Sequence, residues 1–410
     1  MTGVKKIDVS IQLGGKKIEV GEIVSEGKEI YFKYYPSFID LGTEISPIKL
    51  PLSEKTYSAD RLPFDGLFGV FNDSLPDGWG RLLIDRKLGN LGIPLTSVTQ
   101  LDRLTFVGEG GMGALIYSPK EEMGFETGDN LNLEIISDEI QEVQEGLSED
   151  VIEKLIDLGG SSGGARPKIF VGYNKSTDHL IHGTNELPEG YEHWIIKFPT
   201  SNDYPDIANI ELAYYKMALD AGIEMSESRL FTDAKGKAYF GTKRFDRIGN
   251  DRLHMHSAAG LMHDDFRRSS MDYGNLMDCG FRLVKHVGVY EKILRLAAFN
   301  VYAHNRDDHS NNFAFLMNSI GEWSFAPAYD LTFSSSSHGF HSSTVAGESE
   351  APGKVNLMEL AEDFMVKKFE ISIDEVQRAV KNWKQYAEDC GVSKKNTEMI
   401  QSVLKQNLKL

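Results

Sequence analysis

Hydrophobic and polar residues alternate along the first part of the chain. Apolar residues occupy every second position from Ile7 to Leu13, the Gly14-Gly15 pair follows, and the segment "EIYFKYY" at 29–35 alternates again. Successive side chains of a strand point to opposite faces of a sheet, and paired glycines favour a tight turn. The pattern therefore predicts an antiparallel meander with one buried face.

Later segments predict helices among further strands, and then mostly helices. "WGRLLIDRKLGNLG" at 79–92 has helical spacing and ends in glycines, while "FVGEGGMGALIYSP" at 106–119 predicts a Gly-rich turn leading into a strand. Further strands are predicted in "PKIFVGY" at 167–173, "HWIIKFP" at 193–199 and "AYFGTKRFDR" at 238–247, with an amphipathic helix "IELAYYKMALDAG" at 210–222. From about residue 255 the spacing is mainly helical, as in "YEKILRLAAFNVYAHN" at 290–305. Strands first and helices second predict an α+β protein.

The length of 410 residues is too great for one compact core and predicts two or three packed units. Residues 134–153 contain eight acidic residues and no Lys or Arg, which indicates either the exposed face of a helix or a linker. We place a boundary there and expect three parts. These are a β-rich part over 1–133, a middle part over 134–248 and a helical part over 249–410.

Composition and charge exclude several classes of protein. A formal net charge of −17 argues against a wide surface that grips phosphate backbones, because such surfaces need clustered Lys and Arg. The two cysteines, Cys279 and Cys390, cannot form a disulfide framework. The start of the chain does not resemble a signal peptide, and no apolar stretch reaches 18 residues. We therefore expect a cytoplasmic protein with no membrane partner.

The segment "GGSSGGARPK" at 159–168 is rich in backbone N–H donors and ends on two cations, Arg166 and Lys168. Successive amides can form a concavity that binds phosphate. The segment is not a Walker A motif, because the GxxxxGK[ST] spacing is absent and a predicted strand follows. Taken alone, the segment is better explained as a plain linker.

Lys197 lies in the apolar strand "HWIIKFP", and Glu211 opens the amphipathic helix that follows 14 residues later. Protein kinases use a strand Lys paired with a helix Glu to hold the α- and β-phosphates of ATP. The alternative is an exposed Lys at a sheet edge and an unrelated surface Glu.

The segment "HNRDDHSNNFAFL" at 304–316 concentrates carboxylates, amides and imidazoles at the end of a predicted helix. Asp307 precedes Asn312 by five residues, and Asp330 in "FAPAYDLTF" lies 23 residues beyond Asp307. Kinase chemistry uses an Asp that orients the attacking hydroxyl, an Asn five residues later, and a further Asp that binds the metal ions. An Asx-rich turn that caps helices explains one or two of these residues. It does not explain their arrival in kinase order.

With these motifs the sequence resembles the HipA family, serine/threonine kinases of bacterial toxin–antitoxin modules. The segments that carry the resemblance span nearly the whole chain: "ISPIKLPL", "GEGGMGAL", "SSGGARPK", "HWIIKFP", "GTKRFDR", "RDDHSNNF" and "AYDL". The resemblance implies a HipA-like, bilobal, protein-kinase-like α+β fold. Its amino-terminal part would be β-rich and its carboxy-terminal catalytic lobe mostly helical.

The resemblance also implies roles for individual residues with ATP and Mg²⁺ as cofactors. Asp307 would be the catalytic Asp, and Asn312 and Asp330 the Mg²⁺ ligands. Lys197, paired with Glu211, would bind phosphate. The other residues implied to bind ATP are the Gly-rich loop Gly163, Gly164, Ala165, Arg166, Pro167 and Lys168, the hinge Lys243, Arg244 and Phe245, Asp246 near the ribose, and His309.

In the family, autophosphorylation of a Ser in the Gly-rich loop disables ATP binding, and here that residue is Ser161 or its neighbour Ser162. The implied protein substrate is a translation component such as an aminoacyl-tRNA synthetase. The implied partner is a small helix-turn-helix antitoxin, through which alone the chain would reach DNA.

The sequence departs from the commoner family pattern "TDGHAKN", because Arg306, Asp308 and Asn311 replace Thr, Gly and Lys. Loss of the Lys leaves open how the transferred phosphate is neutralised, with Arg306 and Arg166 as candidates.

Two other functions are compatible with parts of the pattern. A pseudokinase or nucleotide-binding scaffold would have no need of an Asp that orients a hydroxyl. A metal-dependent phosphohydrolase could use His304, Asp307, His309 and Asp330. It would need more His ligands and would leave Lys197 without a role.

Overall fold

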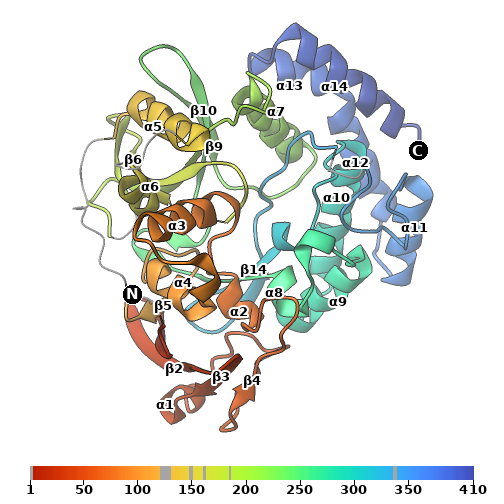
Figure 1. Ribbon diagram of the computed structural model, residues 1–410. Coiled ribbons are helices and arrows are strands. Elements are labelled where there is room, and N and C mark those ends of the chain that lie inside the picture. The colour runs from red at the N-terminus through yellow and green to blue at the C-terminus, as the bar shows by residue number, and fades with distance from the viewer. Residues whose placement is uncertain (1–2, 121–130, 147–150, 160–162, 184–185, 336–338) are drawn as a thin grey trace. The chain divides into compact units, whose positions relative to one another are not determined.

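The computed structural model describes residues 3–120, 131–146, 151–159, 163–183, 186–335 and 339–410. The chain divides into two compact units. The first comprises Met1–Asp203, Phe231–His256 and Leu316–Glu322, and the second Tyr204–Leu230, Ser257–Phe315 and Trp323–Leu410. Figure 1 follows the helices and strands along the chain. Among the described helices, none has both the length and the apolar character that a membrane span requires.

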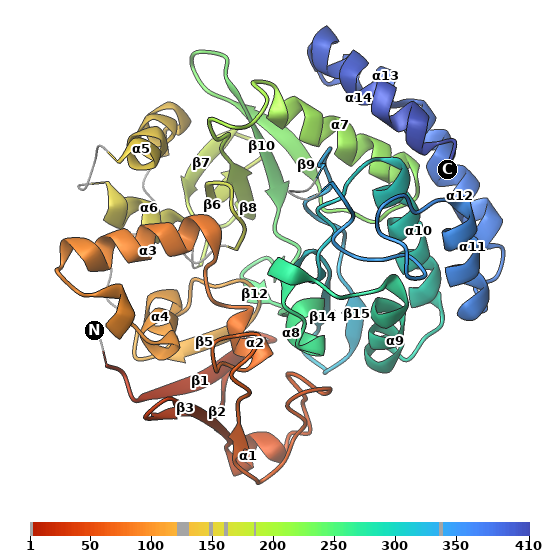
Figure 2. The same ribbon diagram turned by 45° about the vertical axis from the view of Figure 1, so that its right-hand side comes forward.

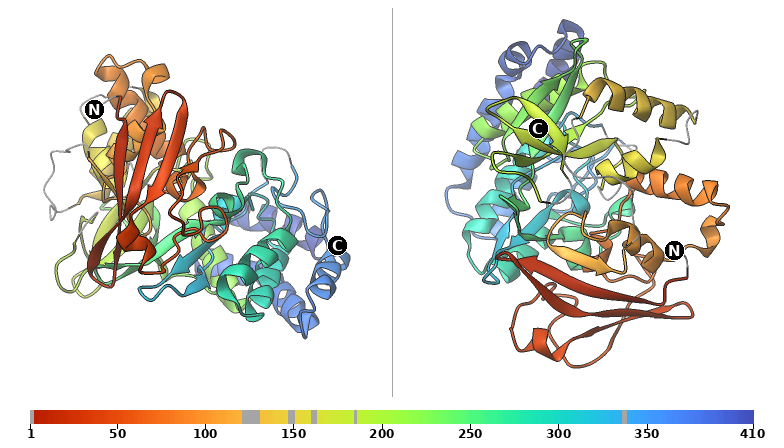
Figure 3. Two further views of the ribbon diagram at one scale, coloured as in Figure 1. Left: turned by 90° about the horizontal axis from the view of Figure 1, so that it is seen from below. Right: turned by 90° about the vertical axis from the view of Figure 1, so that its left-hand side faces the viewer.

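The first unit begins with a five-stranded sheet in the order β4-β3-β2-β1-β5. Its strands are β1 (Lys6–Leu13), β2 (Lys16–Glu26), β3 (Glu29–Tyr34), β4 (Tyr57–Ser58) and β5 (Leu115–Ser118). Strand β1 pairs antiparallel with β2, and β2 with β3, as Figure 3 shows for these strands in red. The predicted meander is confirmed, because Ile7, Val9 and Ile11 are fully buried and the residues between them are more exposed.

The described helices of the first unit all precede β6 in the chain. They are α1 (Pro36–Ile39), α2 (Gly69–Asn72), α3 (Gly78–Asn90), the 3-10 turn η1 (Leu95–Ser97), α4 (Gln100–Val107), α5 (Leu133–Glu145) and α6 (Ile152–Gly159). The helix predicted over 79–92 is α3. The acidic stretch contains α5, which buries Ile136, Ile140 and Val143 and exposes Asp138 and Glu142. Of the two interpretations of these acids, the exposed face of a helix is therefore right for α5.

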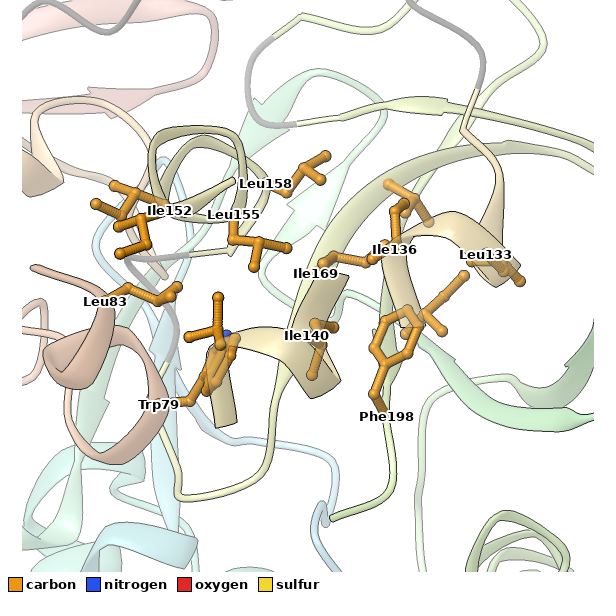
Figure 4. Packing of buried hydrophobic residues seen from close by; sticks show 14 of the residues in the cluster. Trp79, Leu83, Leu133, Ile136, Ile140, Ile152, Leu155, Leu158, Ile169 and Phe198 are labelled. Carbon is orange, nitrogen blue, oxygen red and sulfur yellow. The ribbon is translucent and has the colours of Figure 1, made fainter. Parts of the chain in front are cut away.

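A second five-stranded sheet of the first unit has the order β7-β6-β8-β10-β9. Its strands are β6 (Lys168–Asn174), β7 (His179–His182), β8 (Glu192–Lys197), β9 (Ser228–Thr232) and β10 (Ala238–Lys243), and a short hairpin of β11 (Arg247–Ile248) and β12 (Asp251–Arg252) follows. Figure 4 shows the core on this sheet, in which Trp79 of α3, Ile140 of α5 and Leu155 of α6 pack with Ile169 of β6. Helices α3, α5 and α6 therefore share one hydrophobic core with β6.

The second unit is mainly helical, as predicted for the later part of the chain. It contains α7 (Ile207–Asp220), α8 (Ala258–Met262), η2 (Phe266–Arg268), α9 (Tyr273–Val284), α10 (Gly288–Tyr302), η3 (Ser310–Asn312), β15 (Trp323–Phe325), α11 (Lys354–Asp363), α12 (Phe369–Lys381), α13 (Trp383–Asp389) and α14 (Lys394–Asn407). The chain passes from one unit to the other within β9, within β13 (His254–Ser257) and within β14 (Ala314–Met317), and also after Asp203 and after Glu322. Helix α10 is buried over its last two turns and packs against α9, α11 and α12, which surround it in Figure 2. It ends where the polar segment after residue 303 begins.

Candidate active site

Three neighbouring strands of the second sheet carry the predicted nucleotide-binding residues of the first unit. Lys168 opens β6 and pairs with Lys197, the last residue of β8. On its other side Lys197 pairs with Phe240 of β10. Strand β10 ends at Lys243, opposite Trp194, which is three residues before Lys197 and so roughly 10 Å along the strand. The sheet therefore brings together the end of the Gly-rich segment, the strand Lys and the predicted hinge.

The amino terminus of α3 holds the described part of the Gly-rich segment. Gly164 donates its backbone N–H to a carboxylate oxygen of Asp77 and accepts a hydrogen bond from the backbone N–H of Trp79 at 3.2 Å. Gly164 has φ of +93°, a conformation that favours glycine. Ser161 and Ser162, the predicted sites of autophosphorylation, lie outside the described residues.

The two cations of this segment have defined partners. The ammonium of Lys168 is buried and donates to the backbone carbonyl of Gly163 at 2.5 Å. The guanidinium of Arg166 forms an ion pair with Asp203 at 2.8 Å. Pro167 accepts a hydrogen bond at 2.8 Å from the backbone N–H of Phe198, the residue after Lys197. Ala165, which lies between Gly164 and Arg166, is exposed. The segment is therefore fixed at both sides of this exposed residue.

Lys197 and Glu211 lie in different units, and their predicted pairing stays a prediction. The ammonium of Lys197 lies over the ring of Phe240, 5.4 Å from its centroid, and Lys197 is only partly exposed. Glu211 faces inward from α7 and is 4% exposed. A carboxylate this buried requires a positive or hydrogen-bonding partner, as the kinase interpretation also requires.

A buried cluster of ion pairs includes Arg244 of the predicted hinge. Asp246 accepts hydrogen bonds from Arg244 at 3.0 and 2.8 Å, from Arg247 at 2.7 Å and from the backbone N–H of Gly113 at 2.7 Å. The side chains of Arg244 and Asp246 have no exposed surface. Lys243, in contrast, is partly exposed and pairs with Glu192 at the surface. The carboxylate predicted to lie near the ribose is thus fully engaged by protein groups.

Burial alone would raise the pKa of Asp246, but the charges of Arg244 and Arg247 hold it well below its ordinary value. Arg244 and Arg247 each donate in addition to the carbonyl of Gly111, at 3.2 and 3.1 Å. The guanidinium of Arg244 also stacks over Phe170 of β6, 4.4 Å from the ring centroid. The cluster therefore connects the segment "GEGGMGAL" to Phe170 of β6 and to the residues that follow β10.

Sequence reasoning missed Arg247, Gly111 and Gly113 as parts of this site. The sequence did contain a signal for them. "GEGGMGAL" is one of the segments that carry the family resemblance, although no role was assigned to it. A Cβ atom at Gly113 would lie 2.9 Å from the backbone nitrogen of Met255, and Gly113 has φ of +75°. Both observations require glycine there, so that its N–H can reach Asp246.

In the second unit, the chain turns sharply after α10 and presents Asp307. His304 adopts a left-handed conformation with φ of +56°, and the 3-10 turn η3 follows. The side-chain amide of Asn312 donates to the carbonyl oxygen of Asp307 at 2.8 Å. His309 lies 3.9 Å from the carboxylate of Asp307, which is 57% exposed. The five-residue spacing therefore places Asp307 and Asn312 in one local structure.

Asp330 lies in the same unit, on the segment after β15. It is a non-glycine residue with φ of +54°, a conformation that costs free energy and is common at functional sites. Its neighbour Tyr329 donates to the carbonyl oxygen of Asn311 at 2.8 Å, so the segment is attached to the turn that carries Asn312. Because the amide nitrogen of Asn312 is used by Asp307, its oxygen is the atom that can face a metal. One amide and one carboxylate oxygen fit Mg²⁺, which usually takes its other ligands from water and phosphates.

The phosphohydrolase alternative requires a metal on His304, Asp307, His309 and Asp330. His304 is buried, and one of its ring nitrogens lies 3.1 Å from the side-chain amide of Asn407. Burial lowers its pKa to about 4. Within the described ranges, no three His, Cys, Asp or Glu side chains converge as metal ligands. His304 is instead held inside the protein beside Asn407.

Comparisons with known proteins agree with the geometry. Residues 12–118 match the family model described as the HipA N-terminal domain. Residues 160–406, more than half of the chain, match the HipA-like C-terminal domain. A search of curated protein sequences finds no significant match.

Among solved structures, HipA from the complex of Shewanella oneidensis MR-1 HipA, HipB and operator DNA is similar, with a TM-score of 0.68 and 15% identity. The match covers 98% of this chain and 96% of that one, and it confirms the predicted HipA-like α+β fold. The Helicobacter pylori proinflammatory kinase CtkA matches with a TM-score of 0.36 and 12% identity, over 55% of this chain and 88% of that one. A similarity at that level carries no argument about this chain.

Proposed function

The chain belongs to the HipA family, and from this membership and its site we propose that it is an ATP- and Mg²⁺-dependent serine/threonine kinase acting as a toxin. The observation that carries the proposal is the exposed carboxylate of Asp307, fixed by the amide of Asn312 in the kinase spacing. A scaffold that only binds a nucleotide would not require this arrangement.

In the proposed reaction, Asp307 accepts a hydrogen bond from a serine or threonine hydroxyl and orients its oxygen toward the γ-phosphorus of ATP. The new O–P bond forms as the bond from the γ-phosphorus to the bridging oxygen breaks. ADP leaves with that oxygen, and the hydroxyl proton passes to Asp307. Lys197 would hold the α- and β-phosphates, and Asn312 and Asp330 would hold Mg²⁺, which neutralises phosphate charge when bound. The backbone of Lys243 to Phe245 would contact the adenine.

The proposed protein partner is a small DNA-binding antitoxin, by similarity to the HipA that was solved with HipB and operator DNA. The net charge of −17 supports an indirect association with DNA, through the partner and not through this chain. The proposed substrate is a protein of the translation machinery, such as an aminoacyl-tRNA synthetase.

Incubation of the purified chain with ATP and Mg²⁺, followed by intact-mass spectrometry, tests the kinase activity. We expect a mass gain of one or two phosphates in the parent chain and none in Asp307→Asn. A parent chain that binds nucleotide but never transfers phosphate, to itself or to candidate substrates, would support the scaffold alternative.

We further propose that self-phosphorylation at Ser161 or Ser162 inactivates the enzyme. A phosphate group adds nearly two negative charges at pH 7 and would repel the triphosphate. Arg166 and Lys168 follow in the sequence and could pair with it. The modified parent should lose ATP affinity, whereas the double variant Ser161→Ala, Ser162→Ala should stay active. If the double variant still inactivates itself, the modified residue lies elsewhere.

A further inference from the structure

Asp308 is a departure from the commoner family pattern, and the structure gives it a distinct environment. It lies next to Asp307 but is only 1% exposed, so it cannot act on a substrate. One carboxylate oxygen accepts from the Tyr273 hydroxyl at 2.9 Å and contacts Nδ1 of His341 at 3.0 Å. The other accepts from the backbone N–H of Ser342 at 2.9 Å. A buried carboxylate with this many donors is a fixed structural group.

The contacts of Asp308 bind a segment that follows Asp330 in the chain. The backbone N–H of Ser343 points at the same carboxylate from 3.3 Å, and its hydroxyl donates to the carbonyl oxygen of Asp308 at 2.5 Å. Tyr273 in turn accepts a hydrogen bond from Asn300 of the buried helix α10 at 2.8 Å. Asp308 is therefore held in place through Tyr273 and α10, and it binds consecutive residues of the segment.

Arg306, a second departure, contacts the same segment. Its carbonyl accepts from the backbone N–H of Ser342 at 3.1 Å, and its own backbone N–H donates to the carbonyl of Ser334, which precedes this segment, at 2.9 Å. Its guanidinium donates to the carbonyl of Gly339. Two residues that flank Asp307, and that both differ from the commoner pattern, thus hold one neighbouring segment.

We propose that Arg306 and Asp308 are positioning residues that fix Gly339–Ser343 beside Asp307 as the platform against which a hydroxyl-bearing protein segment is placed. The inference rests on the proposed kinase activity and deepens it. Asp307 can orient a hydroxyl only if the acceptor chain is held within a fraction of an ångström, and flexible neighbours would not do so. The commoner Gly at position 308 has no side chain that could make this anchor.

The proposal predicts that a substitution of Asp308 slows phosphoryl transfer and leaves nucleotide affinity nearly unchanged. Asp308→Asn removes the charge that holds His341 and the two backbone amides but leaves every predicted ATP contact in place. We expect its initial rate of self-phosphorylation, measured by intact mass with Mg²⁺ and ATP, to fall about 10- to 100-fold. Its affinity for Mg·ADP, measured by calorimetry, should stay within about twofold of the parent, because the lost contacts act on placement and not on ground-state binding. Hydrogen exchange of Gly339–Thr344 should become faster.

Two further variants at His341 separate positioning from general destabilisation. His341→Asn keeps a donor near the Nδ1 position and should retain most of the parental rate, whereas His341→Leu should behave like Asp308→Asn. Asp102→Asn is the matched control, because Asp102 is fully buried and accepts hydrogen bonds from the backbone of Val4 and Thr99 at 2.9 and 2.8 Å, outside any predicted site. Asp102→Asn should lose stability but keep the transfer rate.

The outcomes are distinguishable. A parent chain without any phosphoryl transfer contradicts the proposed function. An active parent with an equally active Asp308→Asn variant overturns only the positioning inference. A loss of rate in Asp102→Asn as large as in Asp308→Asn overturns it as well, because general stability would then explain both.

Discussion

The side-chain amide nitrogen of Asn312 donates to the backbone carbonyl oxygen of Asp307 over 2.8 Å. This bond closes the turn between the two residues and fixes the loop that carries the carboxylate. Asp307 keeps 57% of its side-chain surface exposed, whereas Asp308 is 1% exposed. Of the two adjacent carboxylates, only that of Asp307 is accessible from solvent.

Asp307→Asn should abolish phosphoryl transfer and leave nucleotide binding nearly intact. A group that orients or deprotonates the nucleophile typically contributes about 10²- to 10⁴-fold to the rate, and it contributes little to ground-state affinity. Intact-mass spectrometry gives the rate, and calorimetry with Mg·ADP gives the affinity. A variant with near-parental turnover would remove Asp307 from the catalytic role.

Lys197→Met should weaken ATP binding by about 10- to 100-fold, since a charged hydrogen bond to phosphate contributes roughly 1.5–3 kcal/mol. Met keeps most of the aliphatic contact with Phe240, above which the ammonium lies at 5.4 Å. Lys237→Met is the control, because Lys237 makes a similar contact with Tyr239 at 5.5 Å but belongs to no predicted site. Calorimetry should find parental affinity in the control. Equal losses in the two variants would contradict the phosphate role of Lys197.

Local patterns predicted what is local in this molecule. The alternation from Ile7 to Leu13 predicted β1, and the five-residue spacing selected Asp307 and Asn312, which a hydrogen bond joins in the structure. These features depend on residues within about ten positions of one another. The strand order β7-β6-β8-β10-β9 has no such local signal, because pairing in a sheet is set by long-range packing.

The cluster around Asp246 and the anchor at Asp308 could not be predicted for the same reason. Gly113 and Asp246 are 133 positions apart, and His341 and Asp308 are 33 apart. The family resemblance implies that Asp246 lies near the ribose, and it assigns no role to Asp308. The structure distinguishes Asp308 from Asp307, since Asp308 lies inside the protein while its neighbour faces solvent.

Asp246→Asn should lower the free energy of unfolding by about 3–5 kcal/mol, because it leaves Arg244 and Arg247 as buried charges without their carboxylate. Asp307→Asn is the same chemical change at an exposed site and should alter stability by about 0.5 kcal/mol or less. Urea denaturation of both variants measures the difference. A loss in Asp246→Asn no greater than in Asp307→Asn would mean that the cluster does not support the hinge.

The stability of the chain should fall as the pH is lowered from about 6.5 toward 4. Burial lowers the pKa of His254 to about 4, with a further contribution from His256, and burial and Arg244 lower the pKa of His193 to about 4. Both values lie below the ordinary value of 6.5. The unfolded chain therefore takes up protons first as the pH falls, and the folded state loses stability through that window. Above pH 6.5 the contribution is fully present.

At pH 5 each of these two histidines should cost about 2 kcal/mol relative to pH 7. His254→Gln keeps a donor for the carbonyl oxygen of Ile45, which His254 contacts at 2.8 Å, but cannot take up a proton in this range. Urea denaturation at pH 7 and pH 5 should therefore show a smaller loss of stability in His254→Gln than in the parent. The double variant with His193→Gln should show a smaller loss still. If the pH dependence of all three chains is the same, these imidazoles do not titrate as their burial requires.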